Sequence, residues 1–210
     1  MTAFDATFRD QLRELIRWRR DVRHFRRDPL PPGTLERLLE LASLAPSVGL
    51  SQPWRFVLVD DAARRAAVRD NFCSANAMAL GAYAGERAER YAKLKLAGLE
   101  EAPLQLAVFA DRGTEQGHGL GRRTMPEMAE YSAVMAIHTL WLVARAEGLG
   151  LGWVSILDPA EVARILETPP AWIFLGYFCL GYPQRENATP ELERQGWEQR
   201  RGWESFLLRR

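Results

Sequence analysis

The nine residues Arg17-Trp18-Arg19-Arg20-Asp21-Val22-Arg23-His24-Phe25 place four arginines and one aspartate near the start of this chain. Guanidinium groups are planar and permanently charged, and each can bind a phosphate or carboxylate through two parallel hydrogen bonds. The stretch therefore predicts a site for a phosphorylated ligand, held by Arg19, Arg20 and Arg23. The other interpretation is a solvated basic helix end with Asp21 as counterion, since clustered charges usually lie on the surface.

Asp21 is the residue that does not suit a simple phosphate site. A carboxylate within about 4 Å of a phosphate charge costs roughly 4 kcal/mol at an effective dielectric constant of 20. Asp21 must therefore pair with an arginine or point away from the phosphate, toward another part of the ligand.

The segments on either side of this stretch have helical patterns. Apolar residues recur at helical spacing before it, which predicts an amphipathic helix ending in the arginine cluster: Phe4, Phe8, Leu12, Leu15 and Ile16. Prolines then interrupt the chain, and Thr34 is the expected N-cap of a second helix. Residues 45–54 form a Pro/Gly/Ser-rich loop before a strand at 55–59. That loop is either a place to hydrogen-bond a ligand or only a rigid connector.

The middle of the chain alternates helices and strands. Asp60 or Asp61 is expected to cap a helix through residue 72, followed by a mostly helical stretch to about residue 99. Strands are expected at 104–110, 149–156 and 173–181, with a short helix at 159–166. The glycines of 149–156 would let another group approach the backbone closely. In the loop 111–125, Gly117-His118-Gly119-Leu120-Gly121 does not match the dinucleotide fingerprint, because its third glycine is misplaced.

Two segments suggest a partner subunit. Residues 126–147 read as a helix that is apolar nearly all round in its second half, so it must be buried in a core or, as we expect, between subunits. The tail from 190 to 210 carries Trp197 and Trp203 without core periodicity. Such a tail is expected to act as an arm that embraces a second copy of the chain.

Composition excludes several classes of function. The 210 residues are expected to form one domain, 1–210, and a net charge of +1 argues against nucleic acid as partner. The longest apolar run, residues 171–182, is too short to cross a membrane. Cys73 and Cys179 show no disulfide framework, which favours a reducing cytoplasm, and with the three histidines they show no metal-ligand spacing.

Several motifs together resemble a known family. Arg19-Arg20-Asp21-Val22-Arg23, Ala45-Pro46-Ser47 with Gln52-Pro53-Trp54, and residues 148–156 resemble the nitroreductase family of FMN-binding enzymes. Its members normally carry an Arg-Arg-Ser-x-Arg motif that grips the flavin phosphate, and Asp21 here takes the serine position. Further segments resemble the branch that forms dimethylbenzimidazole: 46–49, 94–98, 121–128, 152–156 and 196–200.

The resemblance implies an α+β, nitroreductase-like fold with a central mixed sheet flanked by helices, a C-terminal arm, and a homodimer with FMN at the interface. It also implies a set of site residues. Arg19, Arg20, Arg23 and, as a weaker candidate, Arg200 would hold the phosphate. Asp21 would serve as general base or acid, and Ser155 would position the oxygen adduct or relay protons. The remaining residues that would line the flavin are Val22, Ser47, Leu96 and Val154.

In that branch reduced FMN is itself the substrate. With molecular oxygen the isoalloxazine is fragmented, one ribityl carbon enters the benzimidazole, and erythrose phosphate is released; a separate flavin reductase would supply the reduced FMN. Two other functions stay open. One is an ordinary nitroreductase or flavin reductase with a nicotinamide donor, against which Asp21 argues because such enzymes need no carboxylate beside the phosphate. The other is a flavin-binding protein without turnover, for storage or sensing.

Overall fold

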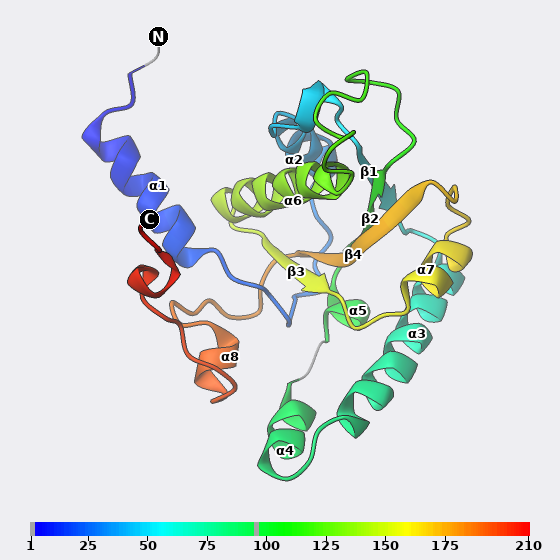
Figure 1. Cartoon of the computed structure of the whole chain (residues 1–210). Helices are drawn as coiled ribbons and strands as arrows, with labels where there is room; N and C mark the ends of the chain where they lie inside the picture. The colour runs from blue at the N-terminus through cyan, green and yellow to red at the C-terminus, as the bar shows by residue number, and fades with distance from the viewer. Residues whose placement is uncertain (1–2, 95–96) are drawn as a thin grey trace.

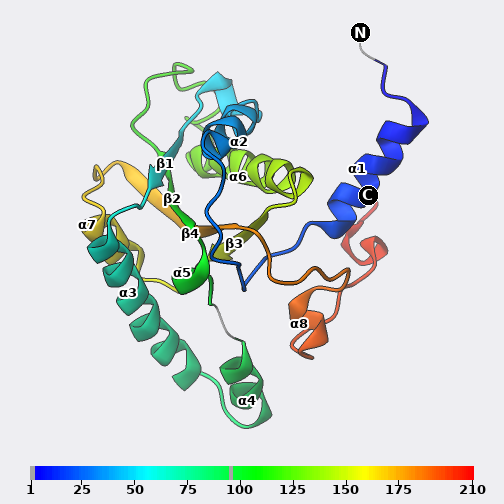
Figure 2. The ribbon, with the colours of Figure 1, turned by 180° about the vertical axis from the view of Figure 1, so that it is seen from behind.

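The computed structural model describes residues 3–94 and 97–210. A central sheet carries helices on both faces, and the C-terminal segment lies beside the first helix (Figures 1 and 2). The elements are α1 Ala6–Trp18, α2 Thr34–Ala42, η1 Val48–Leu50, β1 Trp54–Leu58, α3 Ala62–Gly81, α4 Glu86–Lys93, α5 Gly98–Glu101, β2 Leu104–Asp111, α6 Met128–Ala146, β3 Gly150–Val154, α7 Pro159–Ile165, β4 Trp172–Gly181, α8 Glu191–Arg194 and η2 Trp203–Phe206.

The sheet order is β1-β2-β4-β3, and each neighbouring pair of strands is antiparallel. We expected a mixed sheet. Among the described residues, the parallel pairing is a single bridge between Asp21 and Leu151, supported by a 3.1 Å hydrogen bond from Val22 N to Leu151 O. Since β3 is an edge strand, this bridge lays the arginine-rich segment along its outer edge.

Strand β2 shows how one sheet supports two cores. Leu106 and Val108 face α2 and α6, whereas Ala107 and Phe109 face the core that includes residues of α3, α5 and α7. Residues 105–110 are all buried, which explains why this strand reads as a continuous apolar run instead of an alternating one.

Local side chains cap three of the described α-helices. Asp5, Asp61 and Asp158 cap α1, α3 and α7 by accepting backbone N–H groups of the first turn. Of the two candidates at 60 and 61, the cap is thus Asp61, and its helix runs past residue 72 to Gly81. The expected cap at Thr34 is wrong by one residue. Gly33, in the left-handed conformation at φ 77°, precedes the helix and Thr34 begins it.

Helix α6 was expected to be buried, and the structure confirms this for one of its faces. Its buried residues are Ala129, Ser132, Ala133, Ala136, Ile137, Leu140 and Ala144. Tyr131, Val134 and Met135 remain exposed on the opposite face. Helix α1 has no buried residue and exposes a similar apolar face. A single chain therefore leaves two apolar helix faces uncovered.

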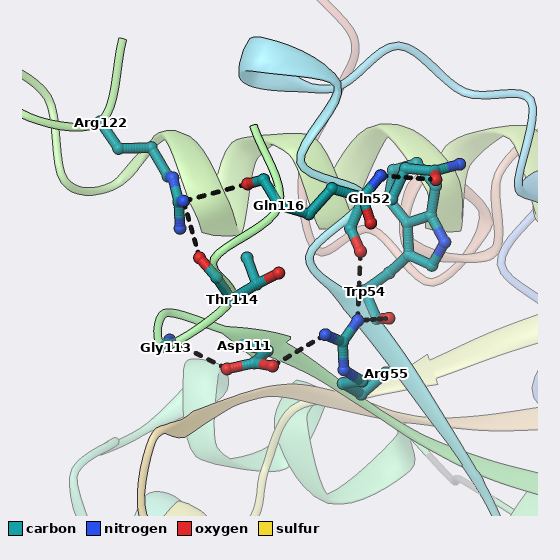
Figure 3. A network of polar contacts seen from close by, with 8 residues as sticks. All are labelled: Gln52, Trp54, Arg55, Asp111, Gly113, Thr114, Gln116 and Arg122. Carbon is teal, nitrogen blue, oxygen red and sulfur yellow. Dashed lines mark hydrogen bonds and ion pairs between the residues drawn. The ribbon is translucent and has the colours of Figure 1, made fainter. Parts of the chain in front are cut away.

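The glycine-rich loop after β2 fastens the 45–54 loop instead of forming a nucleotide turn. A Cβ on Gly117 would lie 2.5 Å from Gly49 O, so only glycine permits this backbone contact. Figure 3 shows the polar contacts alongside: Gln116 Nε2 donates to Gln52 Oε1 at 3.0 Å, and Arg55 pairs with Asp111 at 2.8 Å. These contacts hold the two loops together.

None of the helices that the structure describes combines the length and apolarity needed to cross a bilayer.

Candidate functional site

The site begins where the arginine-rich segment meets β3. A Cβ on Gly152 would lie 2.1 Å from Val22 O, and one on Gly150 would lie 2.6 Å from Val22 Cγ2. Neither glycine has a left-handed backbone, so the absence of a side chain serves close approach alone. This confirms the expectation that glycines in this strand admit another backbone.

The contact places the Asp21 carboxylate against the end of β3. Trp153 N donates a 2.8 Å hydrogen bond to Asp21 Oδ1, while Arg23 Nε lies 3.7 Å from Oδ2. Burial raises the pKa of Asp21 above its ordinary value, although the Trp153 N–H, Arg23 and Arg19 act in the opposite direction. The exposed 37% of the side chain lines a cleft, so Asp21 is directed at a ligand space and is only loosely paired.

Arg19 and Arg20, which directly precede this carboxylate in the chain, both contact Trp141 of α6. Arg19 stacks over the ring of Trp141, with 4.9 Å between guanidinium carbon and ring centroid, and Arg20 O accepts a 2.9 Å hydrogen bond from Trp141 Nε1. Burial, and then the positive charge of Arg200, lower the pKa of both Arg19 and Arg20. Like charges repel one another, and a bound anion would offset this repulsion together with Glu193, whose charge raises the pKa of Arg20.

The donor set fits a phosphate. Arg20 Nη2 donates to Ala188 O, but its Nε is buried without a hydrogen-bond partner among the residues described. A buried donor without a partner is costly, and a phosphate oxygen would satisfy it. The arginine segment could therefore hold the phosphate of FMN.

A cleft of about 350 Å³ opens beside these groups. One wall is Arg20, Asp21, Val22, Arg23 and His24, and the facing wall is Gln184, Arg185, Asn187, Thr189, Glu191 and Arg194. The second wall was missed from the sequence. A polar loop with Asn, Thr and two arginines directly after the last strand was the signal that could have revealed it.

Sequence reasoning named four more residues. Val154 is buried at the end of β3, and Ser155 follows it with an exposed side chain, so both lie near the Asp21–Trp153 contact. Ser47 is elsewhere: its hydroxyl accepts from Gln52 N at 3.1 Å. Leu96 lies outside the described residues.

The contacts of Ser47's neighbour and of Arg20 with helix α6 show how far apart the 45–54 loop and the arginines lie. Val48 N donates to Ser132 Oγ at 3.0 Å, whereas Arg20 is bound to Trp141, nine residues further along the helix. At 1.5 Å per residue the two contacts are about 13 Å apart along the axis. Within one chain, Ser47 thus lies apart from the arginine segment along α6.

An antiparallel sheet between helical layers, with an arginine-lined cleft at its edge strand, defines an α+β protein suited to a phosphorylated ligand. The Nitroreductase family model matches residues 16–182, and the chain belongs to this family. The resemblance read from the motifs is thereby confirmed, as is the α+β, nitroreductase-like fold class, although the strands of the expected mixed sheet pair antiparallel.

Individual relatives narrow this further. The chain is 61% identical over 198 residues to a protein of Rhodospirillum rubrum named 5,6-dimethylbenzimidazole synthase, covering 94% of each chain. A protein of Rhodobacter capsulatus with the same name is 55% identical, covering 93% of this chain and 95% of the relative. A solved structure of oxidized iodotyrosine deiodinase bound to FMN and 3-iodo-L-tyrosine aligns with TM-score 0.72 at 26% identity. The alignment covers 84% of this chain and 91% of the deiodinase chain.

Proposed function

We propose that this chain is a 5,6-dimethylbenzimidazole synthase, which uses molecular oxygen to fragment reduced FMN and releases erythrose 4-phosphate. The product is the lower ligand of vitamin B12 (cobalamin). The carrying observation is the Asp21 carboxylate, fixed on Trp153 N and lining the cleft beside the arginines. Relatives of that name at 55–61% identity over nearly the whole chain support the proposal.

The arginines would bind the phosphate end of the ligand. Arg19, Arg20 and Arg200 form the cationic group, and Arg23 lines the cleft next to Asp21. Because arginine stays charged at any working pH, these contacts would hold the ligand without taking part in proton transfer. When bound, reduced FMN supplies the electrons for oxygen and the carbon atoms of the product.

Asp21 and Ser155 would carry the proton transfers. With Oδ1 engaged by Trp153 N, the Oδ2 atom of Asp21 remains to accept or return a proton. A raised pKa brings this carboxyl closer to neutral pH, where exchange of a proton is easier. The exposed hydroxyl of Ser155, just beyond β3, would relay a proton or hold the oxygen-derived group.

The site is proposed to be completed by a second copy of the chain. Ser47 and the arginines sit at different ends of α6, so a homodimer would bring a partner's 45–54 loop to the cleft. The uncovered apolar faces of α6 and α1 support this arrangement. The exposed Trp203 and Phe206 of the tail, which lies alongside α1 (Figures 1 and 2), agree with an arm.

The proposal also includes the source of reduced FMN and the cellular compartment of the protein. A separate flavin reductase would provide reduced FMN. Cys73 and Cys179 are free thiols, which agrees with a reducing cytoplasm.

The test is to mix the protein aerobically with chemically reduced FMN and to search for dimethylbenzimidazole by chromatography and mass. We expect its amount to scale with enzyme and erythrose 4-phosphate to appear with it. Recovery of intact oxidised FMN with hydrogen peroxide would instead support a flavin reductase, and rapid NADPH oxidation by a yellow protein would support an ordinary nitroreductase. Tight binding without any turnover would support a storage or sensing protein.

A further inference from the structure

Helix α8 ends in a hydrogen-bonded turn that leads directly into Trp197. Gly196 adopts the left-handed conformation at φ 67°, its N–H donates to Glu193 O at 3.0 Å, and Trp197 N donates to Leu192 O at 2.9 Å. This pair of bonds around a glycine is the Schellman motif, which fixes the chain direction after a helix. The path of the backbone into Trp197 is therefore set by this turn.

Trp197 packs on the α3–α4 region. Its ring lies 5.5 Å from Tyr83, edge to face, and 6.2 Å from Tyr91, and the two tyrosines are 5.0 Å apart. Arg90 Nη1 adds a 2.8 Å hydrogen bond to Gly196 O. Tyr91 is 8% exposed and donates its hydroxyl to Asn76 Oδ1 at 2.8 Å, so the surface that receives Trp197 is itself anchored.

The same turn carries the counterion of Arg200. Glu193 Oε1 accepts from Arg200 N at 3.2 Å and lies 3.5 Å from Arg200 Nε. The charge of Arg200 lowers the pKa of Arg19 and Arg20, so these cations repel Arg200 and its pairing with Glu193 offsets that repulsion. Since 67% of the Arg200 side chain is exposed, it is not held by burial.

We propose that Trp197 is a positioning residue, which locks the 193–200 turn onto Tyr83 and Tyr91 and thereby holds Arg200 toward the FMN phosphate. The proposal rests on the phosphate role given above to Arg200. The α3–α4 region would therefore increase the affinity for FMN but not the affinity for a flavin without a phosphate group.

The test compares binding of oxidised FMN with binding of riboflavin, which lacks the phosphate, by quenching of flavin fluorescence. Trp197→Ala should weaken FMN binding about tenfold to a hundredfold, the loss typical of one charge-assisted hydrogen bond, and change riboflavin binding less than about twofold. Arg200→Gln should show the same selectivity. The double variant should bind FMN no more weakly than Arg200→Gln, and Trp197→Phe should restore most of the affinity.

Equal weakening of both flavins by Trp197→Ala would make the residue merely structural and overturn the proposal, as would unchanged FMN binding. If Trp197→Ala does not fold, Tyr83→Leu removes the packing surface and must give the same selective loss. The readout needs no turnover. A wild-type protein that binds FMN but makes no benzimidazole would therefore refute the synthase function while leaving this inference testable.

Discussion

The backbone N–H of Trp153 donates a 2.8 Å hydrogen bond to Oδ1 of Asp21 across a sequence separation of 132 residues. The bond is possible because Gly150 and Gly152 let the arginine segment lie directly on β3. It joins the two parts of the chain that the proposed chemistry needs, the arginines proposed to bind the phosphate and the end of the edge strand. One carboxylate oxygen is fixed by this contact, and the other lies 3.7 Å from Arg23 Nε.

Replacing Asp21 with Asn should abolish proton transfer without disturbing the site. The Asn oxygen can still accept from Trp153 N, but the amide is no base, so benzimidazole formation should fall on the order of 100-fold or more. Affinity for oxidised FMN should stay within about threefold of the wild type. Both are measured on the purified variant, by product mass and by fluorescence titration. Retained product formation would refute the acid–base role of Asp21.

The same substitution should reveal the raised pKa of Asp21 in stability measurements. A carboxyl whose pKa is higher in the folded than in the unfolded state disfavours folding once it is ionised. Its stabilising contribution is full below the unfolded pKa and is lost as pH rises through the folded one. Asp21→Asn should therefore melt above the wild type at pH 7, with a gap that shrinks toward pH 4. A gap that widens on acidification would contradict the direction of the shift.

Gly152→Ala should separate the arginine segment from β3. Its Cβ would meet Val22 O at 2.1 Å, so the backbone must move, at a cost of about 1–3 kcal/mol or more in unfolding free energy. FMN binding should weaken together with stability. Gly81→Ala is the matched control because no atom lies within 4 Å of its Cβ and it ends helix α3. That control should leave both properties unchanged or raise stability slightly, as calorimetry and titration would show.

The Arg55–Asp111 pair should stabilise the loops drawn in Figure 3. Arg55→Met leaves Asp111, 15% exposed, without its partner. We expect a loss of roughly 2 kcal/mol in urea unfolding, less than a fully buried pair because 30% of Arg55 is exposed. Adding Asp111→Asn should recover part of the loss. Arg64→Met breaks the more exposed pair with Glu167 and should lower the unfolding free energy less. Equal losses would contradict the greater contribution of the Arg55–Asp111 pair.

Met135→Glu should disrupt the proposed homodimer. Met135 is 44% exposed on the apolar face of α6, and burying a carboxylate between two copies would be strongly unfavourable. Sedimentation should show a dimer for the wild type and a monomer for this variant. Met78→Glu is the control, since this exposed methionine lies on α3, whose core contacts are on the other side of the sheet. A wild-type monomer would refute the dimer outright.

The sequence alone determined much of the local structure. The helical spacing before Arg17, a cap at Asp60 or Asp61 and the apolar run of β2 each follow from residues close together in the chain. Arginine clustering likewise predicted a phosphate site, because guanidinium chemistry does not depend on the fold. The ordered motifs were sufficient to predict the nitroreductase family.

Only the tertiary structure decided which distant residues meet. It placed Asp21 on Trp153 N, added the wall that carries Arg185 and Arg194, and left Ser47 near the other end of α6. The glycines of β3 predicted a close approach of some other group, but no local pattern encodes which residue makes it, because Asp21 and Trp153 are 132 residues apart in sequence. The physical reason is steric: the two backbones can meet only where Gly150 and Gly152 present no side chain.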